Sequence, residues 1–518
     1  MTITLPSGQP NHRFMRYVRS PIKDSQDHPP LFPLRPETRQ LRLGIDVTTV
    51  PAPEGLLAGY LGRDEIEVQL LVPDGVDVPA AWTAELPDAT VVRLRFNGVP
   101  DTWPMVLPMG VGIRAESRTQ RTHGNESFFP VWQQLDAQAA PPAAEPLTMT
   151  DRHRAAAYSV VAAKLRIDAV VTTSPIAGRS DVADNDVVVS VTPDEAVALI
   201  GHYLRMTSNP DFDVQTDPLV GGGSVTVTHT AGTIVNFYDC GVVSAMPYFG
   251  VFPELAARNG DATTAGVLTS IRVRLARAVR ALDHLLAALS NPVDGQRRAD
   301  VVETASEAFD RQLLYLAAAF DIYGRLYPRL IDPARTSSKQ SLDAMGYIRD
   351  IVERQYDAAE LADVQRLHPY ATVCKVIRNR IHDGVLPVDQ HPGRSYGNST
   401  NIALNLDAMP ELLPGHARVD PRLTQEHYDA LGVWQADPVA VLGSSVTVAD
   451  LATVGVTLMT SGLALVEAFT KLIMWNTPQA ATAPSPLLGW VKAPPGWTEP
   501  PPHEQAVLHR VLFGWHTA

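Results

Sequence analysis

Short stretches in which hydrophobic and polar residues alternate dominate the first part of the chain. Bounded by Pro, Asp and Gly, they comprise residues 41–45, 66–70 and 91–96. Alternation with a period of two is typical of strands that bury one face. We therefore predict a β-rich domain over residues 41–146. Residues 1–40, where proline and charged side chains are frequent, are predicted to form an extended arm.

The next block mixes helical and strand-like patterns, after a linker rich in Ala and Pro at residues 138–146. Start signals and β-branched runs predict helices at residues 151–165 and 193–205, strands at 168–173 and 186–191, and a hairpin at 224–230 and 233–238. This mixture predicts an α/β middle domain over residues 147–262.

Near residue 263 the pattern changes to hydrophobic residues at three- and four-residue steps, which is typical of amphipathic helices. The predicted helices are residues 267–290, 301–331, 342–356, 369–383, 448–475 and 503–513, with a short element near 424–431. A Pro-rich strap precedes the last helix. The predicted fold class is thus α+β, with a mixed α/β N-terminal half followed by an all-α helical bundle over residues 263–518.

Charge narrows the range of partners. The formal net charge of −13 argues against a surface generally coated for nucleic-acid binding, so a phosphate site should be local. One segment stands out, because between residues 366 and 394 eight basic residues face only Asp383 and Asp389. They are Arg366, His368, Lys375, Arg378, Arg380, His382, His391 and Arg394.

Other features bear on cofactors and location. The two cysteines, Cys240 and Cys374, form no metal-binding or disulfide pattern, which favours a reducing cytoplasm. No signal-peptide pattern is present at the N-terminus, and the apolar run at residues 451–466 is predicted to be a buried helix and not a membrane span. Without phosphate-loop or dinucleotide motifs, we predict no cofactor and no metal.

The basic segment carries candidate chemistry on its helix. Arg378 and His382 are four residues apart, so their side chains lie on one face, beside Asn379. An imidazole can move a proton near neutral pH, and a guanidinium can neutralise charge on phosphorus oxygens, which together suit metal-free cleavage of a phosphodiester. Alternatively, the pair serves only to stabilise the C-terminal dipole of the helix.

The sequence IRNRIH at residues 377–382 resembles the Arg-Asn…His signature of HEPN domains, although the three residues between Arg378 and His382 make a shorter spacing than is usual there. An earlier helix, with AFDRQLL at 308–314 and AFD at 319–321, is similar to the HEPN helix that packs against the motif. The resemblance spans about residues 267–475. Many HEPN proteins are metal-independent endoribonucleases of toxin–antitoxin, abortive-infection and antiviral systems, and they commonly dimerise to form one cleft.

This resemblance implies a role for each matching residue. Arg378 would bind phosphate, His382 would transfer the proton, and Asn379 would be the polar residue that follows the arginine. The acidic group that an early helix usually supplies is predicted to be Asp321, with Asp310 as second choice. An alternative for Asp321 is an ion pair with Arg325. The predicted substrate-binding residues are Lys375 and Arg380.

A weaker signal lies in the middle domain. The acidic cluster of Asp181, Asp184 and Asp186, near the strand at residues 168–173, resembles the closing part of PIN-type nucleases, whose carboxylates hold a divalent cation; a solvated turn is the alternative.

We therefore expect an RNA-cleaving effector of a stress or antiviral defence system, a homodimer through the helical domain and without membrane contact, controlled by an unidentified regulatory partner or trigger. The alternative is a catalytically inactive dimerisation or ligand-binding module with a sensor-like N-terminal half.

Overall fold

The structure is a computed structural model that describes residues 40–53, 55–63, 65–97, 110–116, 121–132, 148–177, 190–206, 213–215, 224–226, 231–290, 298–331, 340–352, 356, 358–392, 400–436, 445–476 and 512–514. The predicted arm, except for residue 40, and the Pro-rich strap lie outside these residues, as does most of the predicted last helix.

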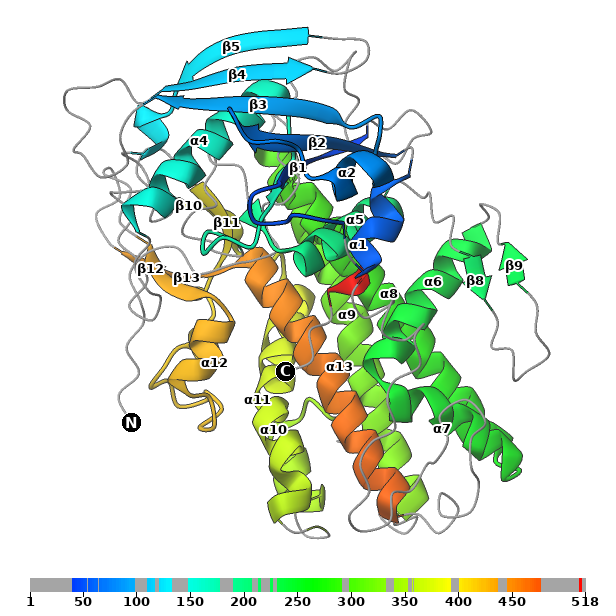
Figure 1. Ribbon diagram of the computed structural model, residues 1–518. Helices are drawn as coiled ribbons and strands as arrows, with labels where there is room; N and C mark the ends of the chain where they lie inside the picture. The colour runs from blue at the N-terminus through cyan, green and yellow to red at the C-terminus, as the bar shows by residue number, and fades with distance from the viewer. Residues whose placement is uncertain are drawn as a thin grey trace.

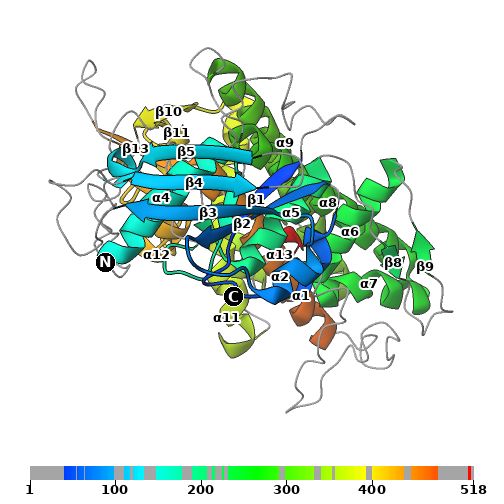
Figure 2. The same ribbon diagram turned by 45° about the horizontal axis from the view of Figure 1, so that its top comes forward.

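A mixed sheet forms the N-terminal half (Figures 1 and 2). In the described residues its strand order is β5-β4-β3-β2-β1-β6-β7. The strands are β1 (Leu41–Asp46), β2 (Ile66–Pro73), β3 (Thr90–Asn97), β4 (Gly110–Glu116), β5 (Arg121–Ser127), β6 (Ala169–Val171) and β7 (Ser190–Val191). Neighbouring pairs from β3 through β2, β1 and β6 to β7 are parallel, whereas β4 and β5 join β3 as an antiparallel extension.

Helices cover both faces of this sheet, and the central strands β1 and β2 are therefore buried at nearly every position, although their sequences alternate. One face packs against α4 (Met149–Leu165), and the other packs against α1 (Gly55–Leu61), α2 (Ala80–Glu85) and α5 (Pro193–Met206). The start signal predicted for α5 is present, whereas α1 and α2 are additional to the predicted elements. Thr192 and Glu195 form reciprocal hydrogen bonds at the start of α5, with N···O distances of 2.9 and 3.3 Å.

The predicted boundary at residue 147 falls inside this unit. Strand β6 follows α4 in the chain, yet it pairs with β1 in parallel register, Leu43 opposite Ala169. The regions predicted as separate domains over residues 41–146 and 147–262 therefore share one sheet. Strand pairing across more than a hundred residues decides this arrangement, and local periodicity carries no information about it.

Long helices form the other half, and the α+β class is confirmed. Four of them correspond to predicted helices, namely α8 (Ala262–Ser290), α9 (Arg298–Ile331), α11 (Ala358–Asp383) and α13 (Leu451–Asn476). Two more, α6 (Ala231–Ala245) and α7 (Pro247–Arg258), lie in the region predicted as part of the α/β middle domain. Helix α8 pairs extensively with α9, and α11 pairs with α13. Their apolar stripes merge into one core that continues onto the sheet through α5.

Helix α13 is long and apolar enough to span a membrane, over Leu451–Ile473. Here it packs against α7, α8, α9 and α11, and 67% of its apolar window is buried within the protein. Its Glu467, only 8% exposed, accepts hydrogen bonds from the backbone N–H groups of Tyr248 and Phe249 at 2.9 and 3.0 Å. The carboxylate thus caps the N-terminus of α7, where negative charge is favoured.

Two predicted elements, a hairpin and a helix, differ in the structure. Residues 233–238, predicted as the second strand of a hairpin, lie in α6; strand β9 (Ser224–Thr226) pairs instead with β8 (Asp213–Gln215). The predicted helix at 342–356 is, in its described part, the short α10 (Met345–Tyr347) followed by a π-helical turn, η3 (Ile348–Val352).

The helical half also contains a small antiparallel sheet between α11 and α13, in addition to the predicted helices. Its order in the described chain is β10-β11-β13-β12. Its elements are β10 (Val388–Pro392), β11 (Thr400–Asn405), β12 (Val433–Ala436) and β13 (Val446–Asp450), with a 3₁₀ turn η4 (Pro410–Leu412) and α12 (Gln425–Ala430) in the connection. The short α12 matches the predicted element near residues 424–431.

Candidate functional site

The last turns of α11 present the predicted residues on one stripe. At about 100° per residue, Lys375, Arg378, Asn379 and His382 fall within about 100° of the helix circumference. Asn379 and His382 are exposed, while Lys375 and Arg378 are half-buried. Arg380 is also exposed but lies about 140° around the helix from Lys375. The helix therefore brings four of the predicted residues together and points Arg380 elsewhere.

A fully buried carboxylate, that of Asp343, lies under this stripe. Its Oδ1 is 2.9 Å from Lys375 Nζ and accepts a hydrogen bond from Ser341 Oγ at 2.6 Å. Its Oδ2 is 3.8 Å from Arg378 Nη2. The side chains of Lys375 and Arg378 remain 34% and 19% exposed. Each therefore lies near the buried carboxylate and is also accessible to solvent. With two cations around one carboxylate, the cluster keeps one net positive charge.

The segment that carries Asp343 is fixed against α9. The Leu342 backbone N–H donates to the Phe320 carbonyl at 3.2 Å, and the Tyr347 hydroxyl donates to the Gly324 carbonyl at 2.9 Å. A Cβ at Gly324 would lie 2.5 Å from Ser341 Cα, so only glycine allows the two backbones to approach this closely. The position of Asp343 thus depends on α9 as well as on α11.

Asp343 occupies the place beside the arginine that the sequence analysis gave to Asp321. Asp321 is half-buried on α9, and in the described chain no hydrogen bond or ion pair joins it to Arg378 or His382. Sequence reasoning missed Asp343 because the residue lies in a short connection without helical periodicity. The second choice, Asp310, is half-buried on α9, where burial together with Glu303 and Glu307 raises its pKa to about 6.

Two hydrogen-bonding atoms within the cluster are buried and have no hydrogen-bond partner. They are Asp343 Oδ2 and Arg378 Nε. The adjacent thiol of Cys374 is neutral, because burial, and next the Asp343 carboxylate, raise its pKa well above the usual range. Cys374 is therefore no nucleophile in this state, and the groups that can act on a substrate are Lys375, Arg378 and His382.

Other members of the basic segment are removed from this site. His368 is fully buried, and its Nδ1 is 2.7 Å from Arg422 Nη2, while Arg422 also forms an ion pair with Asp420 at 2.6 Å. Burial, followed by the charge of Arg422, lowers the pKa of His368 to about 3. Arg366 pairs with Asp363 at 3.3 Å on the exposed surface. Arg394 lies outside the described residues.

A second polar cluster lies at the carboxyl edge of the sheet, where strand order reverses around β1. Such an edge is a common place for ligands in α/β proteins. Here Asp46 is fully buried and accepts hydrogen bonds from the hydroxyls of Thr48 at 2.6 Å, Thr49 at 3.1 Å and Thr172 at 3.0 Å. Both carboxylate oxygens are engaged by hydroxyls, so we assign this cluster to the structure of the sheet edge.

Over the described ranges, no three His, Cys, Asp or Glu side chains lie close enough together to hold a metal ion. The acidic cluster of Asp181, Asp184 and Asp186, noted for its resemblance to PIN-type nucleases, lies outside those ranges.

Comparison with known proteins gives no relative: no protein-family model, no curated protein and no solved structure matches the chain. The residues of α11 and their surroundings therefore carry the evidence on function.

Proposed function

We propose that the helical half is a metal-independent endoribonuclease that acts as an effector in stress or antiviral defence, with its site at the end of α11. The observation that carries the proposal is the stripe of Lys375, Arg378, Asn379 and His382, beneath which a buried carboxylate lies 2.9 Å from the lysine and 3.8 Å from the arginine. A guanidinium that is already positioned near a carboxylate loses less conformational entropy when it binds a phosphate.

The chemistry assigns one task to each group. The 2′-hydroxyl of RNA attacks the adjacent phosphorus, and His382 accepts the hydroxyl proton. The O2′–P bond forms and the P–O5′ bond breaks, leaving a 2′,3′-cyclic phosphate and a 5′-hydroxyl once the leaving oxygen receives a proton. Arg378 and Lys375 stabilise the charge that builds up on the phosphorus oxygens. In a dimer with two α11 helices in one cleft, one His382 acts as base and the other as acid.

A rival function uses the same contacts differently. Lys375 and Arg378 connect α11 to the segment between α9 and α10 through Asp343, at 2.9 and 3.8 Å. Basic residues in a last helical turn also stabilise the helix dipole. On this view the helical half is a catalytically silent dimerisation or ligand-binding module. The buried ion pair is the specific observation that favours it.

Cleavage of total RNA and of tRNA by the full chain in EDTA separates the two. The ribonuclease proposal expects products with 2′,3′-cyclic phosphate ends, and at least a hundredfold loss of rate in His382→Ala and in Arg378→Ala. Matched controls are His123→Ala, an exposed histidine on β5, and Arg366→Ala, an exposed arginine earlier on α11. Both controls should cleave like the parent.

Several outcomes decide against this proposal. Cleavage that requires added Mg²⁺ would exclude the metal-free mechanism. A parent chain that is inactive on RNA, combined with a dimer that dissociates in Arg378→Ala during analytical ultracentrifugation, would support the silent module. Equal cleavage by the parent and by well-folded His382→Ala would remove His382 from the mechanism.

A further inference from the structure

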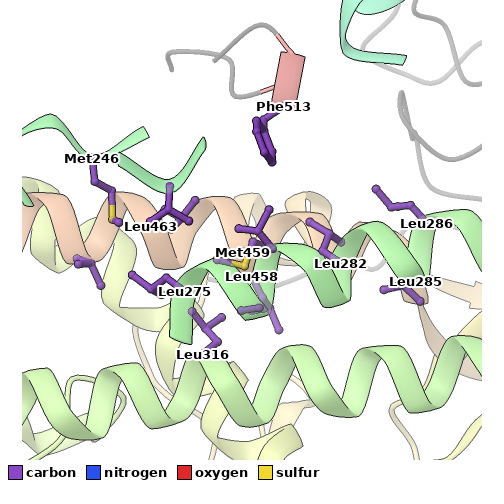
Figure 3. Packing of buried hydrophobic residues seen from close by; sticks show 14 of the residues in the cluster. Met246, Leu275, Leu282, Leu285, Leu286, Leu316, Leu458, Met459, Leu463 and Phe513 are labelled. Atoms are coloured by element: carbon purple, nitrogen blue, oxygen red, sulfur yellow. The ribbon is translucent and has the colours of Figure 1, made fainter. Parts of the chain in front are cut away.

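A short C-terminal segment is seated where the sheet meets the helical half. Residues 512–514 lie between α5, α6 and α8 and are drawn in red in Figure 1. Leu512 is fully buried and Phe513 is 9% exposed. In Figure 3 Phe513 projects from this segment toward the hydrophobic side chains of α8 and α13. We call the surface under it, formed by Gly201, Arg205, Tyr238, Gly241 and Asp283, the tail groove.

Arg205 recognises the segment through its backbone and its ring. Its Nη1 donates to the Leu512 carbonyl at 2.7 Å, and its guanidinium carbon lies 4.0 Å from the centroid of the Phe513 ring. A desolvated guanidinium over an aromatic face is a favourable contact. The same ring packs against Phe237 and Tyr238, with centroid separations of 5.1 and 5.8 Å.

The recognising arginine is held without help from the tail. Its Nε and Nη2 donate to the two oxygens of Asp283 at 2.6 and 3.0 Å, and Tyr238 Oη donates to the same carboxylate at 2.7 Å. The side chains of Arg205 and Asp283 are only 4% and 5% exposed. When the tail leaves, the arginine therefore stays paired and oriented, and the groove keeps its form.

Two glycines make room for the segment. A Cβ at Gly201 would lie 2.2 Å from the Leu512 carbonyl oxygen, and a Cβ at Gly241 would lie 2.4 Å from the Phe513 ring. Gly514 has a φ of 68°, a left-handed conformation that suits glycine. The groove is thus shaped for a backbone carbonyl, an aromatic ring and a glycine in sequence.

The tail groove continues into a small cavity of about 50 Å³, whose walls include Glu195 and His202. Arg205 and Asp283 of the groove line the same cavity, and so does Phe513. Departure of the ring would therefore enlarge a space that the groove already borders.

We infer that the tail groove is a peptide-binding site whose occupant is the chain's own C-terminal segment, and that this segment is an exchangeable latch between the sheet and the helical half. The latch is separate from the α11 site and stands whether or not that site cleaves RNA. Its contacts connect α5, which follows the sheet, to α6 and α8 of the bundle.

Exchange can be measured with a fluorescently labelled peptide of residues 505–518 and the full-length Phe513→Ala chain as receptor. We expect saturable binding, at least tenfold tighter than to the parent chain, whose tethered tail competes at high effective concentration. The same peptide with Phe513→Ala should bind at least tenfold more weakly. Adding Gly241→Ala to the receptor should abolish binding, whereas adding Gly266→Ala, which has open space around it, should not.

A second experiment begins from the correctly folded parent, in case Phe513→Ala misfolds. A specific protease site is inserted among residues 485–495, and the chain is cut after folding. The cut tail should dissociate on dilution and rebind on concentration, followed by size-exclusion chromatography. A tail that never dissociates, a body that unfolds when the tail leaves, or a labelled peptide that binds the parent and the folded Phe513→Ala receptor equally would overturn the inference.

Discussion

Replacing Asp283 by asparagine tests the energetics at the junction between the two halves. The carboxylate accepts two hydrogen bonds from Arg205 and one from Tyr238, and one of its oxygens is 3.3 Å from His202 Nδ1. Asparagine keeps the volume but removes the charge and turns one acceptor into a donor that faces the guanidinium. Arg205 then remains as a buried, uncompensated cation.

The expected loss is large. Breaking a buried ion pair by removing one partner costs about 3–5 kcal/mol, out of a total unfolding free energy of about 5–15 kcal/mol for typical proteins. Burial by itself would raise the pKa of Asp283, but Arg205 and His202 outweigh it and hold this pKa well below its usual value of 3.8. A lowered carboxyl pKa contributes stability that is complete above pH 3.8 and is lost as the pH falls through the folded pKa. At pH 7 the whole penalty should therefore appear.

Urea unfolding, followed by circular dichroism and tryptophan fluorescence at pH 7, measures the effect. The matched control is Asp363→Asn, the same chemical change at a side chain that is 70% exposed and pairs with Arg366. An exposed pair is worth about 0–1 kcal/mol, so the control should unfold almost like the parent. If the unfolding free energy of Asp283→Asn lies within about 1 kcal/mol of this control, the buried ion pair does not stabilise the junction.

Three further changes are expected. Gly324→Ala should lower the unfolding free energy by about 1–3 kcal/mol, because its methyl group would clash with the backbone that carries Asp343. The control Gly266→Ala, in open space on α8, should raise the unfolding free energy by about 0.5–1 kcal/mol in the same urea assay. Similar values for both variants would contradict the close contact. Burial lowers the pKa of His368 to about 3 in the folded chain, against 6.5 when unfolded. The unfolding free energy should therefore fall as the pH drops from 6.5 toward 3, by at most about 1.4 kcal/mol per pH unit. The urea midpoint of His368→Asn should fall less steeply with pH than that of the parent, and equal slopes would refute the neutral, buried state of His368. Cys374 should resist a thiol reagent at pH 8 until urea is added, because its thiol is buried and its pKa is raised; rapid labelling in the native chain, lost in Cys374→Ser, would show that the site is open.

The sequence pattern predicted only part of the candidate site. The spacing of Arg378 and His382 placed both on one helical face, because helix geometry is fixed by three or four neighbouring residues. The sequence did not predict Asp343, because its proximity to Arg378 depends on how the segment before α10 packs against α9 at Gly324. The pairing of a buried acid with a surface cation is a property of packing between segments.

The sequence by itself determined the type and approximate limits of the strongly periodic elements. The strands at residues 41–45, 66–70 and 91–96 and the helices α8, α9 and α13 agree with it, since a buried stripe must repeat with the period of the backbone. Three outcomes depended on tertiary structure alone: the strands that share a sheet, the helical conformation of residues 233–238, and the docking position of residues 512–514. These outcomes depend on contacts between residues far apart in the chain, whose burial outweighs differences of less than about 1 kcal/mol per residue in local propensity.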